Sequence, residues 1–286
     1  MKVFVIGGTG QVGAALLRKT ISHGHTVIAP TREVLDICDQ GMVVQAVGDA
    51  SPDVVVNSAA YTHVDNAESE AELAFQINRD GATNVAIASA EANCPVVHLS
   101  TDYVFDGTKP SPYTEDDRPN PFSVYGKSKL EGEVGVSRHQ PDHIILRTSW
   151  VFSERRQNFV RTMQRLATTG QKIVRVVADQ HGAPTSAMAI ADCITAIFPK
   201  FLEEAFSAWG IYHYTGAPPT TWYEFAKAIL EKQPECQVEP IPTSEYPTPA
   251  KRPLNSVLDC TRLSETFGIN QPHWRNDLEV VIAEIE

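Results

Sequence analysis

A glycine-rich turn near the start of the chain restricts the possible fold more than any other feature. Residues 3–6 form a short apolar run rich in β-branched side chains, as expected of a strand buried on both faces of a parallel sheet. The run ends at Gly7, and Gly10 and Gly13 complete a GxxGxxG pattern at the start of an amphipathic segment, residues 11–22. Glycine at these places permits a tight turn and lets a pyrophosphate approach the backbone at a helix N-terminus. The pattern predicts a nucleotide-binding strand–turn–helix unit, with a purely structural glycine turn as the alternative.

Strand-like and helix-like segments alternate along the first 180 residues. Strand-like runs follow at residues 26–29, 53–57, 95–100, 143–146 and 172–177. Helix-like segments lie between them at residues 40–47, 68–92, 125–136 and 158–167. This alternation predicts an α/β fold, a Rossmann-type doubly wound parallel sheet with helices on both faces.

The composition changes after residue 180, where prolines become frequent and helices are predicted at residues 221–232 and 278–284. We expect a dinucleotide-binding Rossmann domain over residues 1–180 and a smaller C-terminal, mainly substrate-binding lobe over residues 181–286. The lobe should cover the carboxyl ends of the strands, where open α/β sheets bind ligands. No clean linker separates the two parts, so the chain is expected to cross between them.

The charge balance restricts the partners. The chain has 24 Lys and Arg against 35 Asp and Glu, a formal net charge of −11, which disfavours binding to nucleic acid or to anionic lipid. No apolar run approaches the roughly 18 residues of a membrane span, and the glycines after residue 6 interrupt what would otherwise resemble a secretory signal. The five cysteines are widely spaced without a CxxC pair, which favours a reducing compartment. We therefore expect a cytoplasmic protein with no nucleic-acid or membrane partner.

The end of the second predicted strand bears on the choice of cofactor. In the usual NAD pattern an acidic residue there binds the ribose 2′-hydroxyl. This chain has Ala29, Pro30, Thr31 and Arg32 instead, and an arginine can pair with a 2′-phosphate. The sequence thus favours NADP(H), although an ordinary surface arginine beside Glu33 is the alternative.

Two pairs of tyrosine and lysine have the spacing that puts both side chains on one helix face, Tyr125 with Lys129 and Tyr223 with Lys227. A lysine cation beside a phenol stabilises phenolate, which lowers the pKa of the tyrosine toward the range useful for proton transfer. Tyr125 follows the fourth strand of the predicted sheet, whereas Tyr223 begins a helix of the C-terminal lobe. We therefore predict that Tyr125 and Lys129 are catalytic and that Tyr223 only packs.

Hydroxyl groups end the fourth predicted strand, at Ser100 and Thr101. At the carboxyl end of a parallel strand they would face the ligand crevice and could donate to a carbonyl or alkoxide oxygen. The alternative is that they satisfy backbone groups at the strand end.

Taken together, several segments resemble the extended short-chain dehydrogenase/reductase family. The matching stretches are residues 56–68, 100–107, 125–129 with Gly132 and Glu133, 147–152, 179–185 and 246–256. The resemblance implies that Thr101, Tyr125 and Lys129 form a catalytic trio. It also implies that Asp36 and Ile37 contact an adenine and that residues 57–61 line the cofactor.

The predicted cofactor site combines the glycine turn with these segments: Gly7, Thr9, Gly10, Gln11, Val12, Gly13, Arg32, Asp36, Ile37, Asn57, Ala59, Ala60, Tyr61 and Lys129. The resemblance implies a nucleotide-sugar substrate. Its deoxysugar would contact Thr62, Val64, Tyr103 and Trp150, and its pyrophosphate would lie near Arg252 and Asn255.

The implied activity is the NADPH- or NADH-dependent reduction of the 4-keto group of a dTDP-linked 4-dehydro-6-deoxy-L-hexose, a step of nucleotide-sugar and cell-surface polysaccharide biosynthesis. Tyr125 would donate a proton to the developing alkoxide while Thr101 hydrogen-bonds the same oxygen. Lys129 would lower the pKa of Tyr125 and orient the nicotinamide ribose.

Some members of the family that this chain resembles bind Mg²⁺ through three glutamates, and the ion supports a dimer. The corresponding positions here are Ala15, Met188 and Glu284, so two of the three oxygen ligands are missing. We therefore expect no Mg²⁺ at this place and a monomer or weak homodimer.

Two other functions remain open. A nucleotide-sugar epimerase or dehydratase could share the fold, but the dehydratases that this chain resembles carry Asp-Glu after the threonine, where this chain has Asp102 and Tyr103. A non-catalytic subunit resembling the regulatory partner of methionine adenosyltransferase could also share it. The missing metal carboxylates favour that alternative, and the complete trio opposes it.

Overall fold

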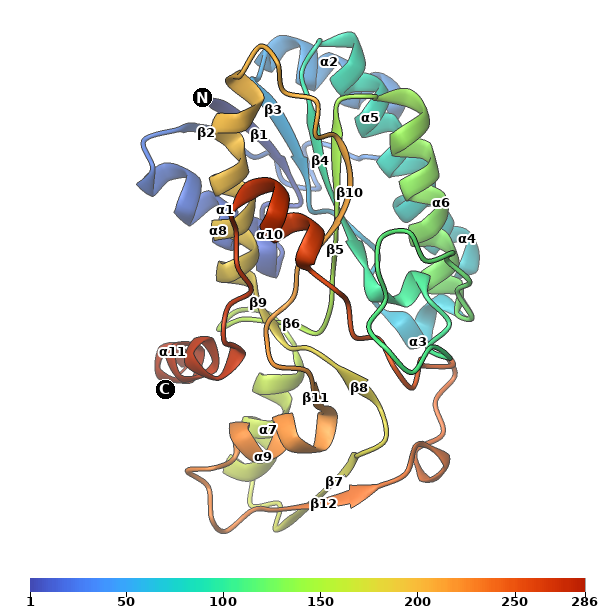
Figure 1. The fold of residues 1–286 in the computed structure, drawn as a ribbon, viewed down its shortest axis with the longest axis vertical. Helices are drawn as coiled ribbons and strands as arrows, with labels where there is room; N and C mark the ends of the chain where they lie inside the picture. Colours follow the sequence, from blue (N-terminus) through green and yellow to red (C-terminus); the bar gives the residue numbers. More distant parts are fainter. Residues whose placement is uncertain (286) are drawn as a thin grey trace.

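The computed structural model describes residues 1–285, and its centre is a six-stranded parallel sheet (Figure 1). The strands lie in the order β10-β5-β4-β3-β1-β2. Their bounds are β1 (Lys2–Ile6), β2 (Thr26–Ile28), β3 (Val54–Asn57), β4 (Val96–Thr101), β5 (His143–Thr148) and β10 (Gly210–His213). Because β1 pairs with β2 on one side and β3 on the other, the turn after β1 lies where the strand order reverses, the usual ligand site of such sheets.

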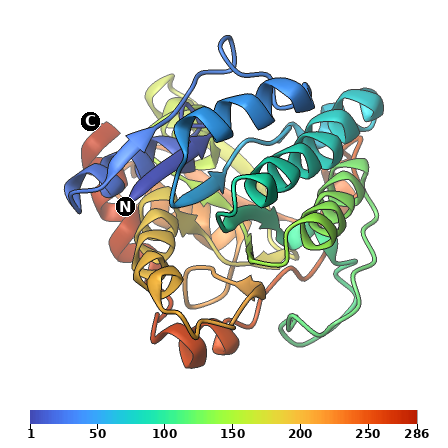
Figure 2. The ribbon, with the colours of Figure 1, turned by 90° about the horizontal axis from the view of Figure 1, so that it is seen from above.

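Alternate residues of each strand pack on opposite faces of the sheet. Val3 and Val5 of β1 belong to one core, and Phe4 and Ile6 belong to the other. Figure 2 shows helices on both sides of the sheet. The first core includes α1 (Gln11–Ser22) and α8 (Ala187–Ile197), and the second includes α2 (Gln40–Ala50), α5 (Ala82–Glu91) and α6 (Val124–His139). The predicted doubly wound α/β fold is confirmed.

The chain passes repeatedly between the sheet and the C-terminal lobe. β10, which follows residue 180, pairs with β5 and completes the sheet. β7 (Ile173–Val177), which precedes residue 180, pairs with β12 (Gln237–Ile241) in a separate two-stranded sheet. The expectation that residues 172–177 join the central sheet is wrong. Ile173 and Arg175 are exposed, so this strand has only one buried face, whereas a central strand has two.

The lobe has its own apolar core below the sheet in Figure 1. Phe225, Trp274 and Phe152 are its largest buried members. Its helices are α7 (Phe159–Thr168), α9 (Trp222–Ile229) and α11 (Trp274–Ile285), and α10 (Thr261–Phe267) packs against the sheet edge instead. Two short strand pairs join the lobe to the sheet. They are β6 (Val151–Phe152) with β9 (Thr185–Ser186), and β8 (His181–Gly182) with β11 (Thr220–Thr221).

The alanine-rich segment at residues 68–92 is not one helix. After α3 (Val64–Ala67), α4 (Ala71–Phe75) passes into a π-helical turn (Gln76–Gly81) before α5 begins. The wide turn presents Asn78, which is 1% exposed, to the backbone of Tyr61. Asn78 Oδ1 accepts from the Tyr61 N–H at 2.8 Å, and its Nδ2 donates to the Tyr61 carbonyl at 3.1 Å. Such turns are frequent next to functional sites, and this one holds the loop after β3.

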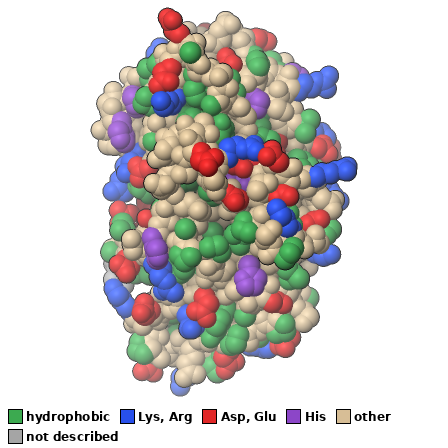
Figure 3. All heavy atoms as spheres, viewed as in Figure 1, with side chains coloured by type: hydrophobic (Ala, Val, Ile, Leu, Met, Phe, Trp, Pro, Cys, Tyr) green, Lys and Arg blue, Asp and Glu red, His purple; other side chains and the backbone are tan. Residues whose placement is uncertain are grey.

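Acidic and basic side chains are interspersed on the face shown in Figure 3, without a broad basic surface. Within residues 1–285, no helix combines the length and the apolar character needed to cross a membrane.

Candidate active site

The glycine turn has the geometry that its sequence predicts. Gly7 has a φ of +83°, and a Cβ there would lie 2.6 Å from the Ala59 nitrogen. A Cβ on Gly13 would lie 2.1 Å from the Gly7 carbonyl oxygen. These two glycines therefore bring the turn against the loop after β3 and against α1. No side chain caps the N-terminus of α1, so its first N–H groups are free to bind an anion.

A cavity of about 210 Å³ lies beside this turn. It brings together eight predicted cofactor residues: Gly7, Thr9, Gly10, Arg32, Asp36, Ile37, Ala59 and Ala60. The cavity combines backbone amides, apolar walls and one guanidinium at its edge, the donor set expected for the adenosine and phosphate part of a dinucleotide. The residues present thus fit NADP(H).

The other predicted cofactor residues from these segments do not line that cavity. Val12 is part of the core under the sheet. Asn57 Nδ2 lies 3.2 Å from His98 Nδ1, and its Oδ1 accepts from the Ala59 N–H at 3.1 Å. The Tyr61 hydroxyl donates to Glu70 at 2.6 Å. Asn57 and Tyr61 therefore shape the loop after β3, and direct contact with the cofactor stays a prediction for them.

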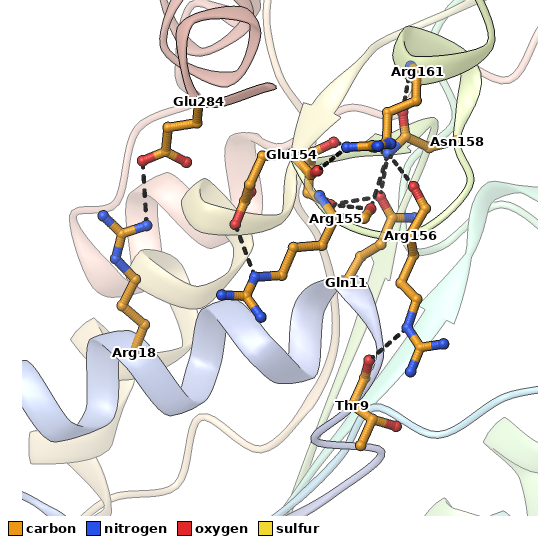
Figure 4. A network of polar contacts seen from close by, with 10 residues as sticks. Thr9, Gln11, Arg18, Glu154, Arg155, Arg156, Asn158, Arg161 and Glu284 are labelled. Carbon is orange, nitrogen blue, oxygen red and sulfur yellow. Dashed lines mark hydrogen bonds and ion pairs between the residues drawn. The ribbon is translucent and has the colours of Figure 1, made fainter. Parts of the chain in front are cut away.

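Gln11 and Thr9 connect the turn to the segment before α7 (Figure 4). Gln11 Oε1 accepts hydrogen bonds from Ser153 Oγ at 2.8 Å and from Asn158 Nδ2 at 3.0 Å. Arg156 Nε donates to the Thr9 carbonyl at 3.0 Å. Asn158 also caps α7 through its Oδ1. The first helix of the lobe is thereby fixed directly to the phosphate-binding turn.

Thr101, Tyr125 and Lys129 meet at the carboxyl end of β4. Thr101 ends that strand, and the two other residues occupy the first turns of α6, which Ser123 caps by accepting from the Gly126 N–H at 3.1 Å. A Cβ on Gly126 would lie 2.2 Å from the Tyr103 carbonyl oxygen. This glycine therefore lets the start of α6 approach the strand end closely, which brings Tyr125 near enough to Thr101 for that side chain to influence the pKa of the phenol.

The electrostatics of the trio differ from the expectation. Burial, with a smaller contribution from Asp102, raises the pKa of Tyr125 to about 12, and only the nearby Thr101 side chain opposes this shift. Lys129 is 2% exposed, and burial lowers its pKa to about 8. Its Nζ donates to the Leu99 carbonyl at 2.6 Å. The expectation that Lys129 lowers the pKa of Tyr125 is wrong for this structure, because the ammonium turns to the backbone of β4.

The second tyrosine–lysine pair lies away from this site, on α9 of the lobe. Lys227 Nζ lies 5.2 Å from the centre of the Tyr223 ring and pairs with Glu224 at 3.3 Å. Tyr223 packs against the core of the lobe. This confirms the interpretation of Tyr223 as a packing residue.

A second cavity, of about 570 Å³, lies between the sheet and the lobe. It brings together four predicted substrate residues: Thr62, Val64, Tyr103 and Arg252. Arg252 Nη2 lies 2.8 Å from Asp65 Oδ2. The Tyr103 and Tyr125 rings meet edge to face at a centroid distance of 5.7 Å, so this cavity adjoins the trio.

Trp150 and Asn255 do not line this cavity. The Trp150 ring stacks on Trp222 at a centroid distance of 3.7 Å, and Trp222 is the ring that lines the cavity. Asn255 Nδ2 donates to the carbonyls of Lys109 at 2.7 Å and Ser111 at 3.2 Å, so it holds a loop. Their predicted substrate contacts stay predictions.

Sequence reasoning missed a set of cavity residues that come mainly from the lobe: His63, Asp65, Phe159, Arg175, Gln180, Trp222, Tyr246 and Thr248. Five of them, His63, Asp65, Gln180, Tyr246 and Thr248, lie in stretches that carry the family resemblance, but the sequence assigned them no contact with a ligand. The remaining lobe residues carry no local pattern, because only the folding of the lobe brings them to the cavity.

Comparison with known proteins extends over the whole chain. Residues 1–286 match the family described as the RmlD substrate binding domain. A dTDP-4-dehydrorhamnose reductase of Sinorhizobium fredii is 45% identical over 280 residues, 96% of this chain and 94% of that protein. A crystal structure of a dTDP-4-dehydrorhamnose reductase from Clostridium acetobutylicum has a TM-score of 0.93 at 36% identity, covering 99% of both chains. The same enzyme from Bacillus anthracis, in complex with NADP, has a TM-score of 0.93 at 34% identity, also covering 99% of both.

Proposed function

The chain belongs to the family of the RmlD substrate binding domain, and from this premise we infer that it is an NADPH-dependent oxidoreductase. The reaction is the reduction of the 4-keto group of dTDP-4-dehydro-L-rhamnose to give dTDP-L-rhamnose. The observation that carries the proposal is the meeting of Thr101, Tyr125 and Lys129 beside the larger cavity, on a sheet whose first turn is built for a dinucleotide.

The cofactor, when bound, supplies the hydride for C4 of the sugar. The free N–H groups at the start of α1 would hold its pyrophosphate. Arg32 would pair with the 2′-phosphate, and Asp36 and Ile37 would contact the adenine. Lys129, at the carboxyl end of β4, would orient the nicotinamide ribose.

Tyr125 acts as the general acid. Its raised pKa, about 12, keeps the phenol protonated at neutral pH, so that it can donate to the oxygen of C4 as negative charge develops there. Thr101 offers a hydroxyl to the same oxygen. Tyr103 and Trp222 supply aromatic surface for the sugar, and Arg252 supplies a positive charge for the diphosphate of the nucleotide sugar.

The test is to follow NADPH oxidation and sugar products with dTDP-4-dehydro-L-rhamnose as substrate. One NADPH should be consumed for each keto-sugar reduced. Tyr125→Phe should lower kcat by about 10²- to 10⁴-fold, the usual contribution of general acid catalysis, whereas the matched variant Tyr223→Phe should keep the wild-type rate. An epimerase would change the sugar without consuming NADPH, and a non-catalytic subunit would do neither, so either result contradicts the proposal.

We also propose that the protein is cytoplasmic and either a monomer or a weak homodimer. All five cysteines are free, which favours a reducing compartment. Ala15 and Met188 offer no carboxylate, and Glu284 pairs with Arg18 of its own chain at 3.3 Å. The mass in solution should therefore be the same with Mg²⁺ and with a chelator, which light scattering after gel filtration would check.

A further inference from the structure

Asp102 is a buried carboxyl group that the proposed mechanism does not use. It follows Thr101 directly, at the start of the short 3₁₀ turn Asp102–Val104, and is 2% exposed. Its Oδ1 accepts from the Thr101 hydroxyl at 3.0 Å. Its Oδ2 is buried without a hydrogen-bond partner among residues 1–285. An ionised carboxylate is costly to bury in this way, so the residue calls for a functional explanation.

Within the part of the chain that the structure describes, residues 1–285, no cation is among the groups that influence this carboxyl. Lys129 donates to the Leu99 carbonyl and Arg252 pairs with Asp65, and neither is among the groups that shift the pKa of Asp102. The titratable groups that face it are the phenols of Tyr103 and Tyr125. Burial raises the pKa of Asp102 to about 6, although the side chains of Ser256 and Thr101 and nearby backbone N–H groups oppose the shift. Both protonation states are therefore accessible near neutral pH.

The protonation state of Asp102 decides where the Thr101 hydroxyl can point. A threonine hydroxyl has one proton and two acceptor positions, and one of these accepts from the Tyr103 N–H at 3.2 Å. When Asp102 is ionised, the hydroxyl proton of Thr101 is directed to Oδ1 and is not available to a substrate. When Asp102 carries a proton, its own O–H can fill the second acceptor position of Thr101. The proton of Thr101 is then free to point into the site.

We propose that Asp102 is a positioning residue: in its protonated form it donates to Thr101 Oγ1 and thereby directs the Thr101 hydroxyl to the keto oxygen at C4. This inference rests on the proposed reduction. No proton leaves Asp102 or Thr101 in the reaction. The proton that ends on the C4 hydroxyl comes from Tyr125, and the two hydrogen bonds in series stabilise the negative charge that develops on the oxygen.

The test is the pH profile of kcat/KM between pH 5 and 8.5, with NADPH and dTDP-4-dehydro-L-rhamnose. For the wild type, kcat/KM should fall above about pH 6, approaching a tenfold loss per pH unit as expected for one ionisation. Asp102→Asn places an amide N–H where the acid proton was. It should keep the low-pH rate within a few-fold and lose this descending limb. Asp102→Ala should be slower than the wild type by an order of magnitude or more at pH 5, and it should also lack the descending limb, because it has no carboxyl group to ionise.

Two further variants complete the design. Asp116→Asn removes an exposed carboxylate that pairs with Arg262 and should keep the wild-type profile. In a Thr101→Val background, adding Asp102→Asn should leave the pH profile of kcat/KM unchanged, because Asp102 acts through Thr101. Circular dichroism should show that each variant is folded, and if Asp102→Ala is not, the asparagine variant still decides.

The inference is overturned if Asp102→Asn keeps the wild-type descending limb, or if at pH 5 it is as slow as Asp102→Ala. Wild-type protein that reduces no keto-sugar at any pH would overturn the proposed function instead.

Discussion

Arg147 on β5 and Glu133 on α6 form a two-point ion pair in the interior of the protein. Arg147 Nη2 lies 2.6 Å from Glu133 Oε2, its Nε lies 2.9 Å from Oε1, and the side chains are 2% and 3% exposed. Ser100 Oγ donates to the same Oε1 at 2.5 Å. Glu133 is one helical turn beyond Lys129, so this contact fixes the helix that carries Tyr125 and Lys129 against the strands that end at the site.

Removing one member of this pair should destabilise the protein strongly. Glu133→Ala leaves the Arg147 charge buried and unpaired, and the free energy of unfolding should fall by about 3–5 kcal/mol. Chemical denaturation followed by circular dichroism would measure this. The double variant Glu133→Leu/Arg147→Met removes both charges and should recover most of the loss. A loss below about 1 kcal/mol, the size found for exposed pairs, would contradict the assignment.

Arg32 should determine the preference for NADPH over NADH. If it pairs with the 2′-phosphate, Arg32→Ala removes a charge-assisted hydrogen bond worth about 1.5 kcal/mol or more, so the KM for NADPH should rise about tenfold. The KM for NADH, which lacks that phosphate, should change little. Arg138→Ala removes an exposed arginine from the last turn of α6 and serves as the control for net charge. Equal changes for both cofactors would show that Arg32 does not contact the phosphate.

The part of the fold that was predictable from sequence is the part that local chemistry specifies. The β-branched runs gave five of the six central strands, and Gly7 and Gly13 stand where the close approaches of the turn exclude a Cβ. The placement of β7 was not predictable in this way. Its apolar run has the composition of a core strand, and its actual partner, β12, lies some 60 residues later in the chain.

In the site, too, local sequence predicts some features, whereas others depend on distant segments. The spacing of Tyr125 and Lys129 fixed their shared helix face, but not that the ammonium would bond the Leu99 carbonyl. Trp222 reaches the larger cavity only because α9 packs in the lobe so that its ring covers Trp150. The surroundings of Asp102 likewise depend on a distant segment, because Ser256 is among the groups that influence the pKa of its carboxyl.

Trp222 should contribute to binding of the sugar nucleotide rather than to chemistry. Trp222→Ala removes an aromatic wall of the larger cavity, and loss of aromatic contacts worth about 0.5–1.5 kcal/mol should raise the KM for the keto-sugar up to about tenfold. The kcat and the KM for NADPH should change little. Trp209→Ala is the matched control, because Trp209 packs on Phe201 and Phe206 outside this cavity. A fall in kcat with unchanged KM for the sugar would contradict this role.

Lys129 should make the free energy of unfolding depend on pH above neutrality. Its pKa is about 8 in the folded protein and near 10.5 when unfolded, so between these values the unfolded chain binds more protons and stability rises with pH. The free energy of unfolding of the wild type, relative to that of Lys129→Met, should rise by up to roughly 3 kcal/mol from pH 8 to 10.5. From pH 6 to 7 this difference between the two proteins should be constant. The measurement is urea denaturation of both proteins at each pH. The two are compared only below pH 10, because tyrosine side chains begin to ionise at about that pH. Lys127→Met, on the exposed side of the same helix, should show no such gain. A difference that stays flat through pH 8 to 10 would mean that Lys129 is not held in a site that disfavours its charge.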